Sequence, residues 1–205
     1  MDFDNFIALV ASKKFEKAEN IYSPEFGNWE ITVNNLRLYL KKMFLLKPQF
    51  LIVGEAPGYL GCRLTGIPFV SEQVIVENDF FSLANGFKVR NAKEPEKESS
   101  AKIVWDYLTY RNIYPLIWNA FPLHPYEDDI HSNRTPNKSE LTFGKEILIE
   151  LTNIFSIKAE NIIAVGRKAE SVLKTYGVTK EVRHPSHGGK AQFIAKMNEY
   201  LPRSF

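Results

Sequence analysis

Glu55, Asn119 and His184 each stand at or just beyond the end of a short apolar run in this 205-residue chain. If the runs are parallel strands, we expect the three side chains to meet, because the carboxyl ends of such strands share one edge of a sheet. Carboxylates and imidazoles are the groups that most often transfer protons in active sites. An amide offers both a donor and an acceptor. The sequence therefore predicts one polar site at this sheet edge.

Each of these residues alone also fits a structural role. Gly54 and Gly58, which flank Glu55, are common turn residues, and Asn119 can cap a loop. His184, which precedes a proline, can be a hydrogen-bonded residue at the rim. Phe69 follows a proline and is more often a core residue than a stacking surface. Only the joint pattern favours a functional site.

Four apolar runs predict the strands that position these residues. They cover residues 49–54, 114–119, 161–166 and 181–184, and they alternate with stretches of helical spacing over residues 101–110, 139–155, 167–176 and 189–201. Strands that alternate with helices of about ten or more residues are typical of a parallel sheet with helices on both faces. We therefore predict an α/β fold, a three-layer α/β/α sandwich around a central, mainly parallel four-stranded sheet.

An N-terminal helical segment is predicted over about residues 1–46. Apolar residues recur at helical spacing over residues 2–19 and again over residues 29–46. Farther along, residues 139–155 open with Ser-x-x-Leu rather than a full capping box, and Gly177 marks a helix end.

Length and composition fit a single domain over residues 1–205. Hydrophobic residues make up 44% and charged residues 24%, and the formal charge of +2 is too weak to indicate a nucleic-acid partner by itself. No apolar run approaches the ~18 residues of a membrane span, and the acidic N-terminus is unlike a secretory signal. We therefore expect a cytoplasmic protein with no membrane partner. The single cysteine, Cys62, excludes a disulfide within the chain.

The stretch Gly86–Ser100 is polar and rich in Lys and Glu. This composition predicts a mobile surface excursion. The alternative is a basic contact surface formed by Lys88, Arg90 and Lys93.

Four motifs, in matching order, resemble those of the uracil-DNA glycosylase superfamily over about residues 48–190. They are Gly54–Gly58 (GEAPG), Thr65–Phe69 (TGIPF), Asn119 at the end of the second run, and His184-Pro185-Ser186. The first is similar to the motif of the iron–sulfur "family 4" enzymes. Arg63-Leu64-Thr65-Gly66 and an acid three residues past Phe69 are more similar to the "family 5" branch. Residues 133–136 (NRTP) resemble the Asn-Arg-x-Pro segment of family 4.

The sequence also departs from these patterns. An iron–sulfur cluster needs four cysteines, so it is excluded, and we expect no cofactor and no metal. Ala56 stands where well-known uracil glycosylases have a water-activating aspartate. Gly58 stands where they have a bulky tyrosine, so we expect a pocket more permissive to substituents on that side. His187-Gly188-Gly189 replaces the usual bulky wedge.

The resemblance implies hydrolysis of the N-glycosidic bond of uracil, or of another deaminated base, flipped out of DNA. Phe69 would stack on the base, and the Asn119 amide would read its carbonyl and N–H edge. Hypoxanthine and xanthine present the same edge, so this contact does not name the base. Residues Gly54, Ala56 and Gly58 would complete the base-binding loop and add backbone N–H donors.

For catalysis, the resemblance implies that His184 hydrogen-bonds the departing anion and that a carboxylate orients water. Glu72 matches the acid of the family 5 pattern and is favoured, with Glu55 as its rival. Glu72 also fits a structural role as a first-turn helix residue.

Further contacts complete the expected site. Ser71, Ser186 and His187 are candidate DNA contacts, and His124 and His131 are assigned ordinary loop roles.

Two other interpretations of the function stay open. A non-catalytic nucleic-acid-binding member of the same fold would also lack the acid at Ala56 and the wedge. An unrelated α/β hydrolase would need a Gly-x-Ser-x-Gly elbow or a phosphate loop, and the sequence has neither. The expected partner is DNA that contains a deaminated base, and the expected state is a monomer.

Overall fold

The computed structural model describes residues 2–201. Its elements, in chain order, are α1 (Asp4–Ala11), β1 (Ala18–Glu19), α2 (Trp29–Leu46), β2 (Leu51–Gly54), α3 (Cys62–Thr65), α4 (Glu72–Glu77), η1 (Leu83–Asn85), α5 (Ser99–Arg111), β3 (Leu116–Asn119), β4 (His124–Pro125), α6 (Lys138–Phe155), η2 (Ala159–Asn161), β5 (Ile162–Val165), α7 (Arg167–Leu173), η3 (Lys174–Tyr176), β6 (Lys180–Val182) and α8 (Lys190–Tyr200). Within the described chain, no helix is long and apolar enough to cross a membrane.

Within residues 2–201, four strands form one sheet in the order β3-β2-β5-β6, and every neighbouring pair is parallel. The strands β2, β3 and β5 are buried along their whole length, which explains why their sequences are unbroken apolar runs rather than alternating ones. The prediction of a central four-stranded sheet is confirmed, and the sheet is entirely parallel.

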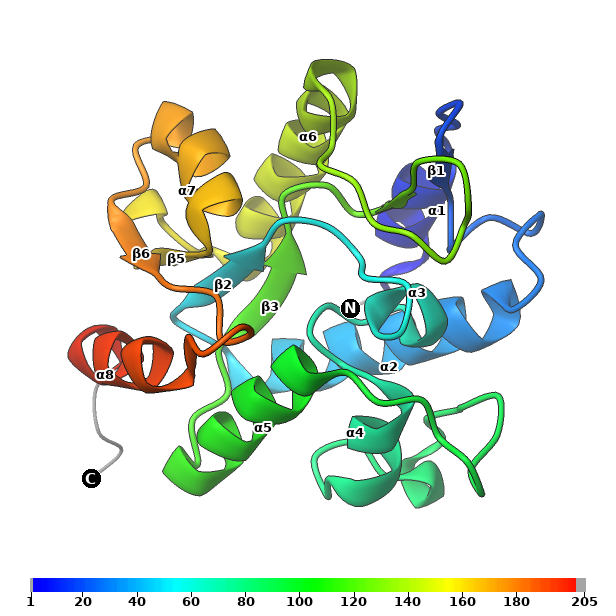
Figure 1. The fold of residues 1–205 in the computed structure, drawn as a ribbon, viewed down its shortest axis with the longest axis horizontal. Helices are drawn as coiled ribbons and strands as arrows, with labels where there is room; N and C mark the ends of the chain where they lie inside the picture. The colour runs from blue at the N-terminus through cyan, green and yellow to red at the C-terminus, as the bar shows by residue number, and fades with distance from the viewer. Residues whose placement is uncertain (1, 202–205) are drawn as a thin grey trace.

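Helices cover both faces of the sheet, as Figure 1 shows. The helices α6 and α7 lie on one side, and α5 and α8 lie on the other, with α2 beside α5. Such a sheet buries both faces against amphipathic helices, and the buried apolar residues form one continuous core. The α/β/α sandwich predicted from the sequence is therefore confirmed.

The first helix ends earlier than predicted. Helix α1 stops at Ala11 instead of continuing to residue 19, and Ala18–Glu19 pairs antiparallel with His124–Pro125. The Asn20 side chain donates to the backbone oxygens of Val10 (3.1 Å) and Lys13 (2.9 Å), which holds the chain in a turn after the helix. The helical spacing over residues 12–19 was therefore misleading.

The start of α6 also differs from the prediction. Asn137 is the N-cap, and its side chain accepts from the Glu140 backbone N–H, while the Glu140 carboxylate accepts from the Asn137 backbone N–H. This is a full capping box that begins two residues before the Ser-x-x-Leu considered from the sequence.

Candidate active site

A cleft of about 550 Å³ opens between the carboxyl ends of β2 and β5. This is the point where the chain order of the sheet reverses, because β2 connects outward to β3 and β5 connects the other way to β6. The cleft is lined by the loops after these strands, together with Glu98, Asn119, Asn133, Arg134 and residues of the His184 motif.

Strand pairing sets the position of Asn119. Gly54 and Asn119 are direct partners in the β2–β3 ladder. A Cβ atom added to Gly54 would lie 2.6 Å from Phe69 Cε2 and 2.7 Å from Asn119 Oδ1. Glycine is therefore required here, because it lets the aromatic ring and the amide come together over the strand end.

Phe69 contributes an aromatic surface beside His184. Its backbone is left-handed (φ 54°), an unusual conformation for a bulky residue. The ring is mostly buried (8% exposed), lines the cleft, and its centroid lies 5.7 Å from that of the His184 ring. The ring is thus both a core residue and part of the cleft surface.

His184 is oriented by its own motif. The Ser186 backbone N–H donates to His184 Nδ1 (3.3 Å), and the Ser186 hydroxyl oxygen lies 2.7 Å from the same atom. Because Nδ1 accepts, the neutral ring carries its proton on Nε2 and is free to donate from there. Burial, followed by the charge of His187, lowers the pKa of His184, which favours this neutral form.

The Asn119 side chain is buried, and its Nδ2 lies 3.9 Å from Cys62 Sγ, within reach of a weak hydrogen bond. Burial, followed by the negative charge of Glu98, raises the pKa of the Cys62 thiol, so this cysteine is not a reactive thiolate. Cys62 therefore serves as a small packing residue at the base of the cleft.

Glu55 lines the cleft from the loop after β2. Its Oε1 atom is buried, has no hydrogen-bond partner among the described residues, and lies 3.5 Å from Lys168 Nζ. Lys168 also contacts the Thr135 hydroxyl. A carboxylate oxygen without a protein donor retains the capacity to accept from a water molecule.

Glu72 and Ser71, both predicted site residues, lie outside the cleft. Glu72 is 1% exposed, and its oxygens accept from the Arg90 side chain and from the backbone N–H groups of Arg90 and Glu96. The Ser71 hydroxyl accepts from Val74 N as the N-cap of α4. The structure does not bring either residue to Asn119 and His184, because both serve the start of α4.

The stretch 86–100 follows the surface, as predicted, but is tied down at two places that the sequence did not indicate. The Asn35 side chain accepts from Lys88 N (2.8 Å) and donates to the Lys88 oxygen (2.8 Å). Glu72 binds Arg90 and Glu96, and Gln73 N donates to the Glu96 oxygen. The stretch is therefore anchored to α2 and α4.

This anchored stretch brings Glu98 into the cleft, where sequence reasoning had not placed it. A Cβ atom on Gly58 would lie 3.1 Å from Glu98 Oε1, and one on Gly61 would lie 2.0 Å from Oε2. The space that Gly58 was expected to leave open is therefore occupied by a carboxyl group. No motif signals Glu98, because its position depends on a loop that folds back from more than thirty residues away.

Residues 133–136 complete one side of the cleft. Asn133 Oδ1 accepts from Tyr59 N (3.2 Å), and Arg134 forms a two-point ion pair with the buried Glu140.

His124 is fully buried and bridges the backbone oxygens of Pro57 and Ile130, so it has the structural role that was predicted. His131 is exposed and pairs with Asp129.

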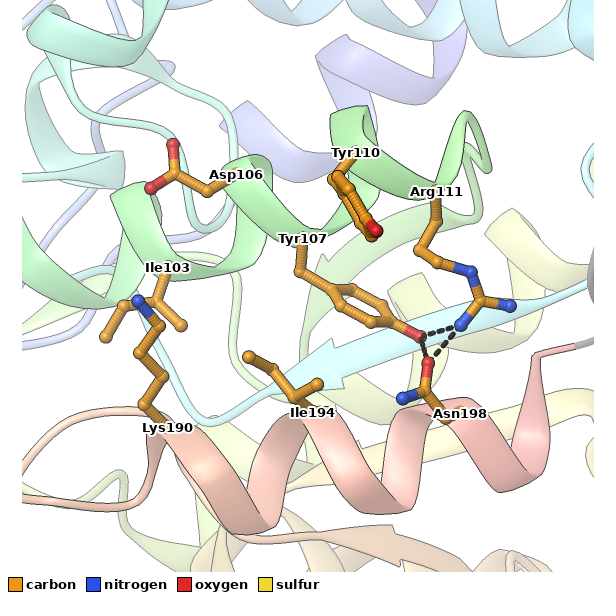
Figure 2. Close-up of a pocket in the computed structure, with 8 residues that line it drawn as sticks. All are labelled: Ile103, Asp106, Tyr107, Tyr110, Arg111, Lys190, Ile194 and Asn198. Atoms are coloured by element: carbon orange, nitrogen blue, oxygen red, sulfur yellow. Dashed lines mark hydrogen bonds between the residues drawn. The ribbon is translucent and has the colours of Figure 1, made fainter.

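A second hollow, of about 640 Å³, lies on the other side of the sheet between α5 and α8. Figure 2 shows it to be lined by Tyr107, Tyr110 and Arg111 of α5 and by side chains of α8, with Asn198 bonded to Tyr107 and Arg111. None of the predicted site residues lines it. The candidate active site is therefore the cleft between β2 and β5.

The fold and the cleft together define an α/β protein with a ligand site at the switch point of a parallel sheet. The family model described as "Uracil DNA glycosylase superfamily" matches residues 42–202. The match covers more than half of the chain, so the protein belongs to the uracil DNA glycosylase superfamily.

Comparison with solved structures supports the same fold. Wild-type Pedobacter heparinus SMUG2 is similar over 96% of this chain and 95% of its own, with a TM-score of 0.62 and 14% sequence identity. No curated protein matches the chain.

Proposed function

We propose that the protein is a DNA glycosylase that hydrolyses the N-glycosidic bond of uracil or another deaminated base in DNA. The observation that carries the proposal is that Phe69, Asn119 and His184 line one cleft of a superfamily member. An aromatic face, an amide and an imidazole N–H are the three contacts that a flipped-out base with a carbonyl and an N–H needs.

The proposed reaction uses these residues in fixed roles. The base stacks on Phe69, and the Asn119 amide pairs with its carbonyl and N–H edge. The glycosidic bond breaks with its electron pair on the base, and His184 Nε2–H donates a hydrogen bond to the resulting anion. The water oxygen then bonds to C1′ of the sugar.

Glu55 is the carboxylate that best suits the water-activating role. Glu55 lines the cleft, and its buried Oε1 accepts no hydrogen bond from the described residues, whereas the oxygens of Glu72 are occupied. Glu55 would accept the water proton and offset the positive character of the sugar. The Lys168 ammonium lies 3.5 Å from Glu55 Oε1 and places a positive charge beside the carboxylate.

The cleft edge carries cations that suit a DNA backbone. Arg167 and Lys168 are exposed, and His187 lies on the same edge with Ser186. Side chains of this kind position a duplex through its phosphates without reading its sequence.

A single-turnover assay tests the function. Labelled oligonucleotides with uracil, hypoxanthine or xanthine are incubated with excess protein, and alkali then cleaves any abasic site. We expect abasic sites with wild-type protein and with Glu146→Gln, an exposed carboxylate variant on α6. We expect a loss of 100-fold or more with His184→Ala and with Glu55→Gln, the usual scale for a general base.

Two outcomes would overturn parts of the proposal. Full activity of Glu55→Gln together with an inactive, folded Glu72→Gln would return the base role to Glu72. Binding of DNA without any abasic product from folded wild-type protein would favour a non-catalytic binding member of the fold.

A further inference from the structure

We propose that Glu98 determines base selectivity by donating a hydrogen bond from its carboxyl group to the extruded base, which favours deaminated purines over uracil. This inference rests on the proposed function. It adds a contact that belongs to neither the superfamily motifs nor the predicted site.

The first step is the position of the carboxyl group. It lies against Gly58 and Gly61, where an added Cβ would be 3.1 Å and 2.0 Å from its two oxygens. Gly61 precedes Cys62, whose Sγ lies 3.9 Å from Asn119 Nδ2. Glu98 therefore borders the cleft on the Cys62 side of Asn119, while Phe69 and His184 lie together elsewhere on its lining.

The second step is that the Glu98 side chain does not cap the helix that begins after it. Glu98 is the N-cap residue of α5, and its backbone oxygen accepts from Lys102 N (3.1 Å), yet its side chain makes no cap hydrogen bond within the described chain. The carboxyl group lines the cleft, and its local contact is the side chain of Ser100. The backbone N–H of Glu96, two residues earlier, donates to Glu72, and this contact fixes the position of the chain just before Glu98.

The third step is the protonation state. Burial raises the pKa of Glu98, and a hydrogen bond with Ser100 opposes this rise without cancelling it. The titratable groups that share the cleft lining with it are Glu55, Cys62, Arg134, Arg167, Lys168, His184 and His187. A raised pKa makes the neutral carboxyl, which is a donor as well as an acceptor, more available at working pH.

The fourth step is the chemistry of the base. If Asn119 pairs with a carbonyl and its neighbouring N–H, the edge on the other side of the carbonyl presents C5–H in uracil, a methyl group on C5 in thymine, and the acceptor N7, bonded to C5, in hypoxanthine and xanthine. A protonated Glu98 can donate to N7 and finds no acceptor on C5–H. A methyl group there would meet the carboxyl directly.

Ionisation of Glu98 reverses the preference. A carboxylate would face the N7 lone pair and the charge of the departing base, and both contacts are repulsive. Excision of hypoxanthine relative to uracil should therefore decline as pH rises through the raised pKa of Glu98. The same ratio should stay constant on the acid side, where the carboxyl is already protonated.

The experiment compares single-turnover rates on hypoxanthine and uracil, from pH 5 to pH 9, for wild type, Glu98→Gln and Glu98→Ala. Glu94→Gln, an exposed residue of the same stretch, is the matched control. We expect Glu98→Ala to lower the hypoxanthine-to-uracil ratio about tenfold, the scale of one buried hydrogen bond. The Glu98→Gln amide keeps a donor, so this variant should retain the ratio and lose its decline at high pH.

The outcomes separate this inference from the proposed function. If wild type excises both bases and the ratio is unchanged in Glu98→Ala, selectivity does not reside in Glu98 and the inference is wrong. If the ratio falls equally in Glu98→Gln and Glu98→Ala, an amide donor of the same shape does not replace the carboxyl group, and the inference that Glu98 acts as a hydrogen-bond donor is wrong. If folded wild type excises no base, the proposed function fails first. Urea midpoints of all variants confirm that they are folded.

Discussion

Replacing Glu72 by glutamine separates a structural carboxylate from a catalytic one. Its two oxygens accept four hydrogen bonds, from Arg90 N (2.8 Å), Arg90 Nε (3.0 Å), Arg90 Nη2 (3.1 Å) and Glu96 N (3.1 Å). Glutamine keeps one carbonyl oxygen, so two of these donors would face an NH₂ group instead. The substitution leaves the shape of the side chain almost unchanged, which isolates the effect of charge and acceptor capacity.

The expected change in the free energy of unfolding follows from the lost hydrogen bonds. A hydrogen bond to a charged group is worth roughly 1.5–3 kcal/mol, so two lost bonds sum to about 3–6 kcal/mol. The Arg90 side chain is 35% exposed and regains water, which reduces the loss. We expect the free energy of unfolding to fall by about 2–3 kcal/mol, which lowers the Tm by roughly 5–10 °C in a protein of this size.

The stability difference between wild type and Glu72→Gln should decrease as pH falls. Burial alone would raise the pKa of Glu72, but the hydrogen bonds from Arg90 and Glu96 outweigh it, and the pKa lies below the ordinary value of 4.5. The stabilisation is therefore complete above about pH 4.5 and disappears as pH falls through the lowered pKa. Urea unfolding at pH 7 and pH 3 measures this, and the two proteins should converge at the lower pH.

The single-turnover rate of excision tests whether the role of Glu72 is structural. Arg90→Gln breaks the same contact from the other partner, so both variants should reduce the single-turnover rate to a similar, modest extent through the displaced Glu98 stretch. A Glu72→Gln protein with unchanged stability and a rate reduced more than 1,000-fold would show that Glu72 takes part in the chemistry and that our structural assignment is wrong.

Three further predictions concern the cleft and its support. Gly54→Ala places a methyl group 2.6 Å from the Phe69 ring, so we expect excision to fall 100-fold or more and stability to fall by about 1–3 kcal/mol, while Gly27→Ala, which has open space around it, should change neither. Glu140→Gln leaves the Arg134 guanidinium without its buried partner and should lower the free energy of unfolding by about 3 kcal/mol in urea titrations; a change under 0.5 kcal/mol would contradict the pairing. An NMR titration should give His184 a pKa below 6.5, and the excision rate should fall on the acid side of that pKa, because a proton on Nδ1 opposes the hydrogen bond from its own motif; a raised pKa would contradict this orientation.

The sheet was predictable because its signal is local. The strands Leu51–Gly54 and Ile162–Val165 contain no polar side chain, and strands buried on both faces are recognised by such runs. Helix α2 matched its predicted limits of 29 and 46 for the same reason. The end of α1 was missed because it depends on Asn20, a side chain that binds back across the turn.

Part of the cleft was also predictable, namely the residues that directly follow strands. Asn119 and His184 line the same cleft because strand ends share an edge, and this is a property of topology. Glu72 and Glu98 could not be assigned from the sequence, because both depend on how residues 86–100 fold back. The charged composition of that stretch indicated exposure, whereas its anchors are two buried polar side chains, Asn35 and Glu72.

The two anchors of residues 86–100 also have a consequence for how this protein can be altered. The strand ends carry the proposed chemistry, while a separate stretch, inserted between α4 and α5, supplies one border of the cleft. A stretch fastened at fixed points can be exchanged for another of different length and sequence, provided that the partners of Asn35 and Glu72 are retained. Variants with new preferences can therefore be sought by randomising this one segment, with the strands left untouched.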